Sequence, residues 1–163
     1  MKFIHIFLFI LALVPQLALA INDTRQMENV SWDEKLGSII DLNSKIISTD
    51  GSNMSLDQIL DQDKPTVFVL AYYSCPRMCT FLLDGTFDAV SSNTEARPGI
   101  DYNLVTLSFD SSDTPEFARS KEEKYEKKLN QGESWNFFVA EDISIKSISD
   151  SVGFKFVKDG NDF

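Results

Sequence analysis

Two cysteines, Cys75 and Cys79, are the residues of this sequence whose type and spacing could do chemistry, within the stretch PTVFVLAYYSCPRMCTFLLDG. The sequence holds 2 cysteines in its 163 residues, so any chemistry of sulfur here uses this pair. Side chains four positions apart can meet across one turn of a helix. The pair can therefore close as a disulfide or converge on one metal ion.

The residues on either side of the cysteines predict where the pair lies. Residues Thr66 to Tyr73 form a continuous apolar, β-prone run, typical of a strand buried on both faces. Residues Thr80 to Val90 carry apolar side chains at helical spacing. A central strand that ends in a tight turn and a helix places the turn at the carboxyl edge of the sheet, at the positive end of the helix. We expect both thiols to be more acidic there than a free cysteine.

The spacing of the two cysteines distinguishes several kinds of site. A thioredoxin-type redox motif has two intervening residues, whereas this loop has three, Pro76-Arg77-Met78. Two soft thiolates without nearby carboxylates select Cu(I) or zinc over hard cations. A closed zinc site requires four protein ligands, so copper, which accepts low coordination, fits better. An inert structural disulfide and a peroxidatic cysteine are the alternatives, and Arg77 alone would supply the positive charge that a peroxidatic cysteine needs.

The first twenty residues have the layout of a cleavable secretory signal. Lys2 is followed by an apolar run from Phe3 to Val14 and then by Ala18-Leu19-Ala20, small residues that suit a cleavage site. The apolar run is shorter than the roughly 20 residues that span a bilayer, and an uncleaved membrane anchor is the alternative. We therefore expect an exported protein of the bacterial periplasm, soluble after cleavage near Ala20 or tethered to the inner membrane if uncleaved. Export would place the cysteines in an oxidising compartment.

The charge of the chain limits its partners. The formal net charge is −10 at pH 7, and loss of Lys2 with the signal makes it more negative. Such a surface repels nucleic acid and anionic lipid and favours cationic partners, metal ions among them. We expect no nucleic-acid binding, and membrane contact only through a partner or an uncleaved signal. The single histidine, His5, lies in the signal, which excludes a Ser-His-Asp or Cys-His hydrolase for the mature chain.

The rest of the sequence alternates between strand and helix patterns. The predicted elements are a strand Leu36 to Ile47, a return strand or single turn Met54 to Leu60, a strand Tyr102 to Phe109, a helix Pro115 to Leu129, a strand Trp135 to Ala140, a helix Glu141 to Val152 and a strand Phe154 to Val157. Asp50-Gly51 predicts a hairpin turn, and Asp113 or Thr114 a helix cap. The alternation predicts one α/β domain with a mainly parallel central sheet. This domain would span residues 36–163, after the signal (1–20) and a flexible arm (21–35).

Four blocks of the sequence, taken in order, carry a resemblance to a known family. These are Glu34-Lys35-Leu36-Gly37, the run Tyr72 to Cys79, Leu104 to Asp110 with Asp113-Thr114-Pro115-Glu116, and Val152-Gly153-Phe154. Together they resemble the Sco/SenC family, copper proteins that serve assembly of cytochrome c oxidase. The resemblance covers essentially the whole chain after the signal. It implies a thioredoxin-like fold, with a central mainly parallel sheet flanked by helices.

This resemblance implies a function for the cysteine pair. Cys75 and Cys79 would ligate one copper ion, as Cu(I) or Cu(II), and would also form a reversible disulfide. The protein would act as a metallochaperone for the dinuclear copper centre of cytochrome c oxidase rather than as an enzyme. Its partners would be the copper-bearing oxidase subunit, other periplasmic copper carriers and thiol reductants. The alternative is a thiol-disulfide oxidoreductase, in which one cysteine attacks a substrate disulfide and the other resolves it.

The sequence departs from the family pattern at its carboxyl end. Family members complete the copper site with a histidine from a loop after the strand that corresponds to Gly153-Phe154, followed by further strands and a terminal helix. This sequence ends at Phe163 without such a histidine. The resemblance therefore implies a truncated member that lacks one ligand, the C-terminal strands and the helix. We expect such a chain to bind copper, Cu(II) above all, more weakly and to expose an unpaired strand edge.

Overall fold

The computed structural model describes residues 29–75, 77–158 and 163. The predicted signal, with its cleavage near Ala20, lies outside the described residues. The chain divides into two compact units: Gly37–Ser151, which holds both cysteines, and a second unit made by the chain up to Leu36 and from Val152 onward.

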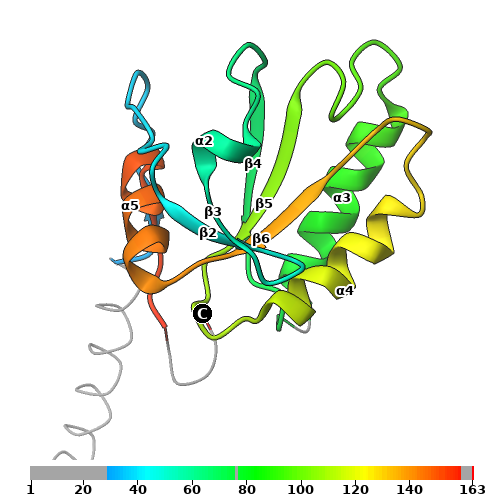
Figure 1. Cartoon of the computed structure of the whole chain (residues 1–163). Helices are drawn as coiled ribbons and strands as arrows, with labels where there is room; N and C mark the ends of the chain where they lie inside the picture. Colours follow the sequence, from blue (N-terminus) through cyan, green and yellow to red (C-terminus); the bar gives the residue numbers. More distant parts are fainter. Residues whose placement is uncertain (1–28, 76, 159–162) are drawn as a thin grey trace, which may run out of the picture. The chain divides into compact units, whose positions relative to one another are not determined.

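A mixed sheet of five strands forms the centre of the larger unit (Figure 1). Its strands lie in the order β3 (Asn53–Ser55), β2 (Lys45–Ser48), β6 (Asn136–Val139), β5 (Asn103–Ser108) and β4 (Thr66–Ala71). β4, β5 and β6 pair in parallel, whereas β2 pairs antiparallel with both β6 and β3. The parallel strands require crossover connections, which helices supply here. The prediction of an α/β fold is therefore confirmed.

Helices cover both faces of this sheet. They are α2 (Leu56–Ile59), α3 (Met78–Ser92), α4 (Pro115–Glu126) and α5 (Asp142–Val152). Figure 1 shows α3 and α4 together on one side of the sheet and α5 on the other. The Tyr125 hydroxyl of α4 donates to Asp84 Oδ1 of α3 at 2.8 Å, and Lys124 Nζ lies 2.8 Å from the same oxygen. None of the helices in the described part of the chain combines the length and apolar character needed to cross a membrane.

The core of the larger unit is built around β5. All six residues of this strand are buried, as expected of a strand with neighbours on both edges and helices on both faces. Beside it, the rings of Tyr125, Trp135 and Phe137 lie with their centroids 5.0 to 6.0 Å apart. Trp135 Nε1 donates to Thr106 Oγ1 at 2.8 Å, so this buried ring has its polar atom paired. The cluster fixes α4 against the centre of the sheet.

The strand that leads to the cysteines differs from its prediction. The sequence predicts a central strand buried on both faces, but β4 lies at the edge of the sheet and pairs with β5 alone among the described strands. Val67 is 46% exposed, and the buried residues of β4 are Val69 and Ala71. A continuous apolar run indicates that the side chains favour burial, but it does not show whether another element covers the strand.

Other elements agree with their predictions in type but not in extent. The predicted strand Leu36 to Ile47 is confined to β2, which begins at Lys45. Residues Met54 to Leu60 include the end of β3 and the single-turn α2. The Asp50-Gly51 hairpin is confirmed: β2 and β3 pair antiparallel, and Gly51 has a φ of 89°, a conformation that glycine adopts without steric cost.

The smaller unit contains a two-stranded antiparallel sheet of β1 (Ser31–Trp32) and β7 (Phe154–Lys155). The rings of Trp32 and Phe154 meet edge to face with centroids 5.8 Å apart. The Asp33 amide donates to the Gly153 carbonyl at 2.8 Å. Gly153 has a φ of 75°, and a Cβ there would fall 1.7 Å from the Asp33 oxygen, so a larger residue would force the two segments apart. A strand thus lies within the stretch 21–35 that the sequence predicts as a flexible arm.

Helix α5 offers a matched test of the core. Ile148 is 0% exposed, whereas Ile143 on the same helix is 78% exposed. We expect Ile148→Ala to lower the free energy of unfolding by about 2–5 kcal/mol, because it removes buried apolar groups and leaves a cavity. Ile143→Ala should change it by less than about 0.5 kcal/mol. Urea denaturation followed by circular dichroism measures both values, and an equal loss in the two variants would contradict this orientation of α5.

Candidate thiol and metal site

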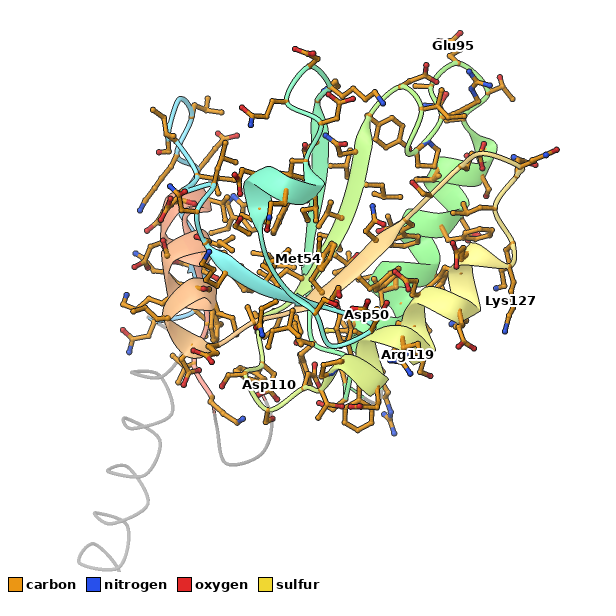
Figure 2. All side chains as sticks on the ribbon, in the orientation of Figure 1. Asp50, Met54, Glu95, Asp110, Arg119 and Lys127 are labelled. Atoms are coloured by element: carbon orange, nitrogen blue, oxygen red, sulfur yellow. The ribbon has the colours of Figure 1, made fainter. Side chains whose placement is uncertain are left out.

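The two cysteines lie at the carboxyl edge of the parallel strands. Cys75 lies in the loop that follows β4, and Cys79 is the second residue of α3. β4 and β5 pair in parallel along their whole length, so the loops that follow them leave the sheet at the same edge. Asp110, just after β5, marks this edge in Figure 2, and Glu95 marks the opposite end of the strands.

The structure brings the two sulfurs together. Both side chains are buried, at 7% and 9% exposed, and both thiols are free. The Cys79 amide donates to Cys75 Sγ at 3.3 Å, and the Tyr72 amide donates to Cys79 Sγ at 3.4 Å. Each sulfur therefore accepts a backbone N–H, which favours its charged form. Because both thiols are free here, the reversible disulfide stays a prediction.

The two thiols differ in acidity. Burial raises the pKa of the Cys75 thiol, but hydrogen bonds from the Cys79 amide, the Tyr72 hydroxyl and the Arg77 amide outweigh burial, so its pKa is lower than usual. Burial, together with the charge of the neighbouring Cys75 sulfur, raises the pKa of Cys79 to about 11. The expectation that both thiols are more acidic than a free cysteine is confirmed for Cys75 and wrong for Cys79.

A buried carboxylate, Asp113, supports the cysteine loop. The sequence predicts Asp113 or Thr114 as a helix cap, and Thr114 occupies the N-cap position of α4. The Asp113 carboxylate instead accepts hydrogen bonds from the amides of Tyr73 and Ser74, just before Cys75. Sequence reasoning missed this role because the Ser74 contact joins positions 39 apart in the chain. The signal that could have found it is the position of Asp113 after a parallel strand, at the same sheet edge as the cysteines.

The described residues offer two sulfur donors rather than a complete ligand cluster. No group of three or more His, Cys, Asp or Glu side chains that could hold a metal occurs within residues 29–75, 77–158 and 163. Two thiolates suit a soft ion of low coordination number and do not complete a zinc site. The donor chemistry therefore fits Cu(I) better than zinc or a hard cation.

Two large apolar side chains of the first turn of α3 are exposed. Met78, next to Cys79 in the sequence, is 74% exposed, and Phe81 is 69% exposed. Exposed patches of large apolar side chains are typical of protein–protein interaction surfaces.

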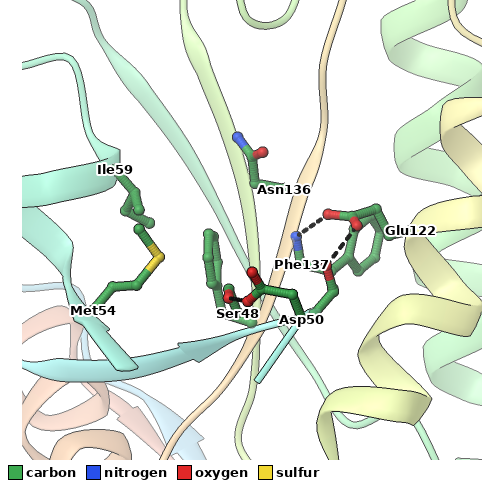
Figure 3. A pocket seen from close by; sticks show the side chains of 9 residues that line it. Ser48, Asp50, Met54, Ile59, Glu122, Asn136 and Phe137 are labelled. Carbon is green, nitrogen blue, oxygen red and sulfur yellow. Dashed lines mark hydrogen bonds between the residues drawn. The ribbon is translucent and has the colours of Figure 1, made fainter. Parts of the chain in front are cut away.

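A separate pocket of about 470 Å³ lies among the β2–β3 hairpin, α4 and β6 (Figure 3). Asp50, Glu122 and Asn136 line it, but neither cysteine does. The Glu122 carboxylate accepts hydrogen bonds from Thr49 Oγ1 at 2.8 Å and from the Phe137 amide at 3.4 Å, and burial raises its pKa. Asp50 accepts the Ser52 amide of its own turn at 2.9 Å. Both carboxylates are used within the fold, so the cysteine loop is the better candidate site.

Comparisons with known proteins give structural but not sequence matches. No protein-family model matches the chain, and no curated protein matches it. A candidate electron transfer protein from Aquifex aeolicus VF5 is similar in structure, with 24% identity and a TM-score of 0.66 over 79% of this chain and 73% of that one. ScoI of Arabidopsis thaliana with copper bound is 19% identical, with a TM-score of 0.56 over 76% of this chain and 74% of that one.

A third solved structure is BsSco, a member of the Sco family of cytochrome c oxidase assembly proteins. It is 15% identical, with a TM-score of 0.56 over 82% of this chain and 74% of that one. At such identities a structural likeness reports the fold rather than the function. The chain therefore has the thioredoxin-like fold of the Sco proteins, which the blocks around the cysteines predict.

The difference between the two thiols has a measurable consequence. A thiol reacts as its thiolate, so its alkylation rate rises as the pH passes its pKa from below. Because the pKa of Cys75 is lowered and that of Cys79 is raised to about 11, we expect Cys75 to react first. At pH 8, iodoacetamide should modify Cys75 at least about tenfold faster than Cys79. Peptide mass spectrometry of timed samples measures both rates, and equal rates would contradict the assignment.

Proposed function

We propose that this chain is a copper-binding protein of the Sco/SenC family that carries one copper ion on Cys75 and Cys79 during assembly of cytochrome c oxidase. The observation that carries the proposal is the pair of buried, converging thiols at the carboxyl edge of a Sco-type fold. ScoI of Arabidopsis thaliana, which shares this fold, has been solved with copper bound, and this supports copper as the ion.

The chemistry of the loop favours Cu(I) as the bound form. Thiolates are soft donors, and Cu(I) is the soft ion that two sulfurs can satisfy. Both thiols must lose their protons to bind the ion, and this is harder at Cys79, whose pKa is about 11. Copper binding should therefore release protons. A third donor, such as the histidine that the resemblance implies, would strengthen the binding of Cu(II).

The partner we propose is the copper-bearing subunit of cytochrome c oxidase. BsSco, which shares the fold, belongs to a family of cytochrome c oxidase assembly proteins. The signal-like first twenty residues support export to the periplasm. The exposed side chain of Met78, next to Cys79 in the sequence, offers a partner an apolar contact.

The same two thiols support a second function, reduction of a disulfide in a partner protein. The observation in its favour is the difference in acidity between Cys75 and Cys79. The Cys75 thiolate attacks a partner disulfide, forms a mixed disulfide and releases one partner thiolate. Cys79 then gives up its proton to solvent and attacks the Cys75 sulfur, which releases the second partner thiolate. Two electrons pass to the partner, and the Cys75–Cys79 disulfide remains.

Copper carriage is tested by anaerobic titration of the reduced protein with Cu(I) against a chromogenic chelator. We expect one Cu(I) per chain. Cys75→Ser and Cys79→Ser should each lower the affinity at least about a hundredfold, because each removes one of two soft donors.

The matched control for this titration is Ser74→Ala. It removes an exposed side chain directly beside Cys75 and should retain the affinity of the parent protein. A parent protein that forms no one-to-one complex with Cu(I) would contradict the copper proposal. A Cys79→Ser variant with unchanged Cu(I) affinity would also contradict it.

Reductase function is tested by trapping the mixed disulfide. In Cys79→Ser the second step cannot occur, so we expect this variant to accumulate an adduct with glutathione when it is mixed with oxidised glutathione at pH 7. Cys75→Ser should accumulate far less adduct, because the pKa of its remaining thiol is about 11. Intact-protein mass spectrometry measures both adducts. Equal accumulation in the two variants would contradict Cys75 as the attacking thiol.

A further inference from the structure

We propose that Asp113 is a positioning residue that sets the redox equilibrium and the copper affinity of the Cys75 and Cys79 pair by clamping the backbone of the loop that carries Cys75. The inference rests on the proposed function in one respect, because it takes these two thiols as the working groups of the site. Asp113 acts on them through the loop amides that its carboxylate binds.

The two oxygens of the Asp113 carboxylate divide between two successive amides. The Tyr73 amide donates to Oδ2 at 2.5 Å, and the Ser74 amide donates to Oδ1 at 3.2 Å. Ser108, the last residue of β5, also donates its hydroxyl to Oδ2 at 2.6 Å. Asp113 is 6% exposed, so these three donors replace the water that a carboxylate would otherwise bind.

Asp113 is itself held by the loop that follows β5. Its amide donates to the Asp110 carbonyl at 3.0 Å, and the Asp110 amide donates to Ser108 Oγ at 3.1 Å. The Phe109 amide continues the pairing of the two strands by donating to the Ala71 carbonyl at 3.0 Å. One carboxylate therefore joins the loop after β4 to a loop that is anchored on the neighbouring strand.

The clamp, meaning the hydrogen bonds from the Tyr73 and Ser74 amides to Asp113, lies between Tyr72 and Cys75 in the chain. Tyr72, just before the clamped amides, donates its own amide to Cys79 Sγ, and Cys75, just after them, accepts the Cys79 amide. Fixing the amides of Tyr73 and Ser74 fixes the path of the chain from Tyr72 to Cys75. The two sulfurs are thus held near one another before any bond forms between them.

Holding the two sulfurs close together favours both the disulfide and the copper complex. Two thiols held together close a disulfide at a smaller entropy cost, so the clamp stabilises the disulfide against the dithiol. Two sulfurs held together also bind one ion more tightly than two that must first be ordered. The negative charge of the Asp113 carboxylate adds an attraction for a copper cation at the loop. Loss of the clamp should therefore make the disulfide easier to reduce and the copper complex weaker.

Asp113→Asn tests the clamp with little change in side-chain volume. The amide keeps one acceptor oxygen, but its NH₂ group would face a backbone N–H, so at least one loop hydrogen bond is lost. The equilibrium measured is protein disulfide plus two glutathione thiols giving protein dithiol plus one glutathione disulfide. We expect its constant to rise at least about tenfold, equivalent to about 30 mV, in the variant. The Cu(I) affinity should fall at least about tenfold.

Asn103→Ala is the matched control for a general loss of stability. Asn103 is buried at the opposite end of the same two strands, where its Nδ2 donates to the Asp61 carbonyl at 2.8 Å and to Thr66 Oγ1 at 3.1 Å. We expect this variant to melt at a lower temperature, because it removes the hydrogen bonds that the buried Asn103 side chain makes. Its glutathione equilibrium should stay within about twofold of the parent value, because these bonds lie far from the thiols along both strands.

Ser108→Ala is a second variant that keeps the carboxylate and removes one of its three donors. We expect it to shift the glutathione equilibrium in the same direction as Asp113→Asn but by less. If Asp113→Asn does not fold, Ser108→Ala tests the clamp instead. An unchanged glutathione equilibrium in Ser108→Ala would overturn the proposal.

The glutathione equilibrium is measured without copper, so the clamp and the copper proposal can fail separately. A parent protein that binds no Cu(I), together with a shifted equilibrium in Asp113→Asn, would contradict copper carriage and support the clamp. A folded Asp113→Asn protein with parental redox equilibrium would overturn the clamp even if the parent binds copper. An equal shift in Asn103→Ala would also overturn it, because the effect would then follow from lost stability alone.

Discussion

The parallel pairing of β4 with β5 is the constraint on which the site depends. Its register ends with Ala71 opposite Ser108, and the Phe109 amide extends the pairing by one more hydrogen bond to Ala71. Two loops from distant parts of the sequence therefore leave the sheet at one point. One carries the thiols, and the other carries the carboxylate of Asp113. In an antiparallel pair the loop after β5 would lie at the far end of β4, and Asp113 could not reach Tyr73.

The start of α3 explains why two cysteines of one short loop differ in acidity. The first amides of a helix have no partner within the helix, and the Cys79 amide finds one in the sulfur of Cys75. Cys75 lies outside the helix and accepts from this positive end. Cys79 lies inside the first turn, where burial outweighs the single amide that Tyr72 donates to it. The position of each sulfur relative to the helix start, rather than the spacing alone, decides which thiol is the more acidic.

Local patterns in the sequence predict the type of most elements, but their places in the sheet depend on long-range pairing. The runs that become β4 and β5 are both apolar, and nothing within them tells which lies in the centre. The sequence predicts β4 as the buried strand, whereas the structure gives that place to β5. The Asp50-Gly51 turn was predictable because a two-residue signal determines it locally.

The residues of the candidate site also differ in how far the sequence predicts them. Cys75 and Cys79 are predicted from residue type and spacing, since both belong to one turn of the chain. The role of Asp113 cannot be predicted from a local pattern, because its partners Tyr73 and Ser74 lie 40 and 39 positions away. The acidity of Cys79 is mispredicted for a related reason. A helix start favours a thiolate, but the degree of burial, which outweighs it here, depends on the packing of the whole unit.

Copper binding and thiol reduction require the same thing of this loop, two sulfurs held close together without a bond between them. They differ in the proton of Cys79. Attack by Cys75 on a disulfide needs one thiolate, and the lowered pKa of Cys75 favours it. Cu(I) must displace the protons of both thiols, and the pKa of Cys79 is about 11. The ion therefore competes with a proton at Cys79, so that copper is held less tightly as the pH falls, while the first step of thiol exchange depends on Cys75 alone.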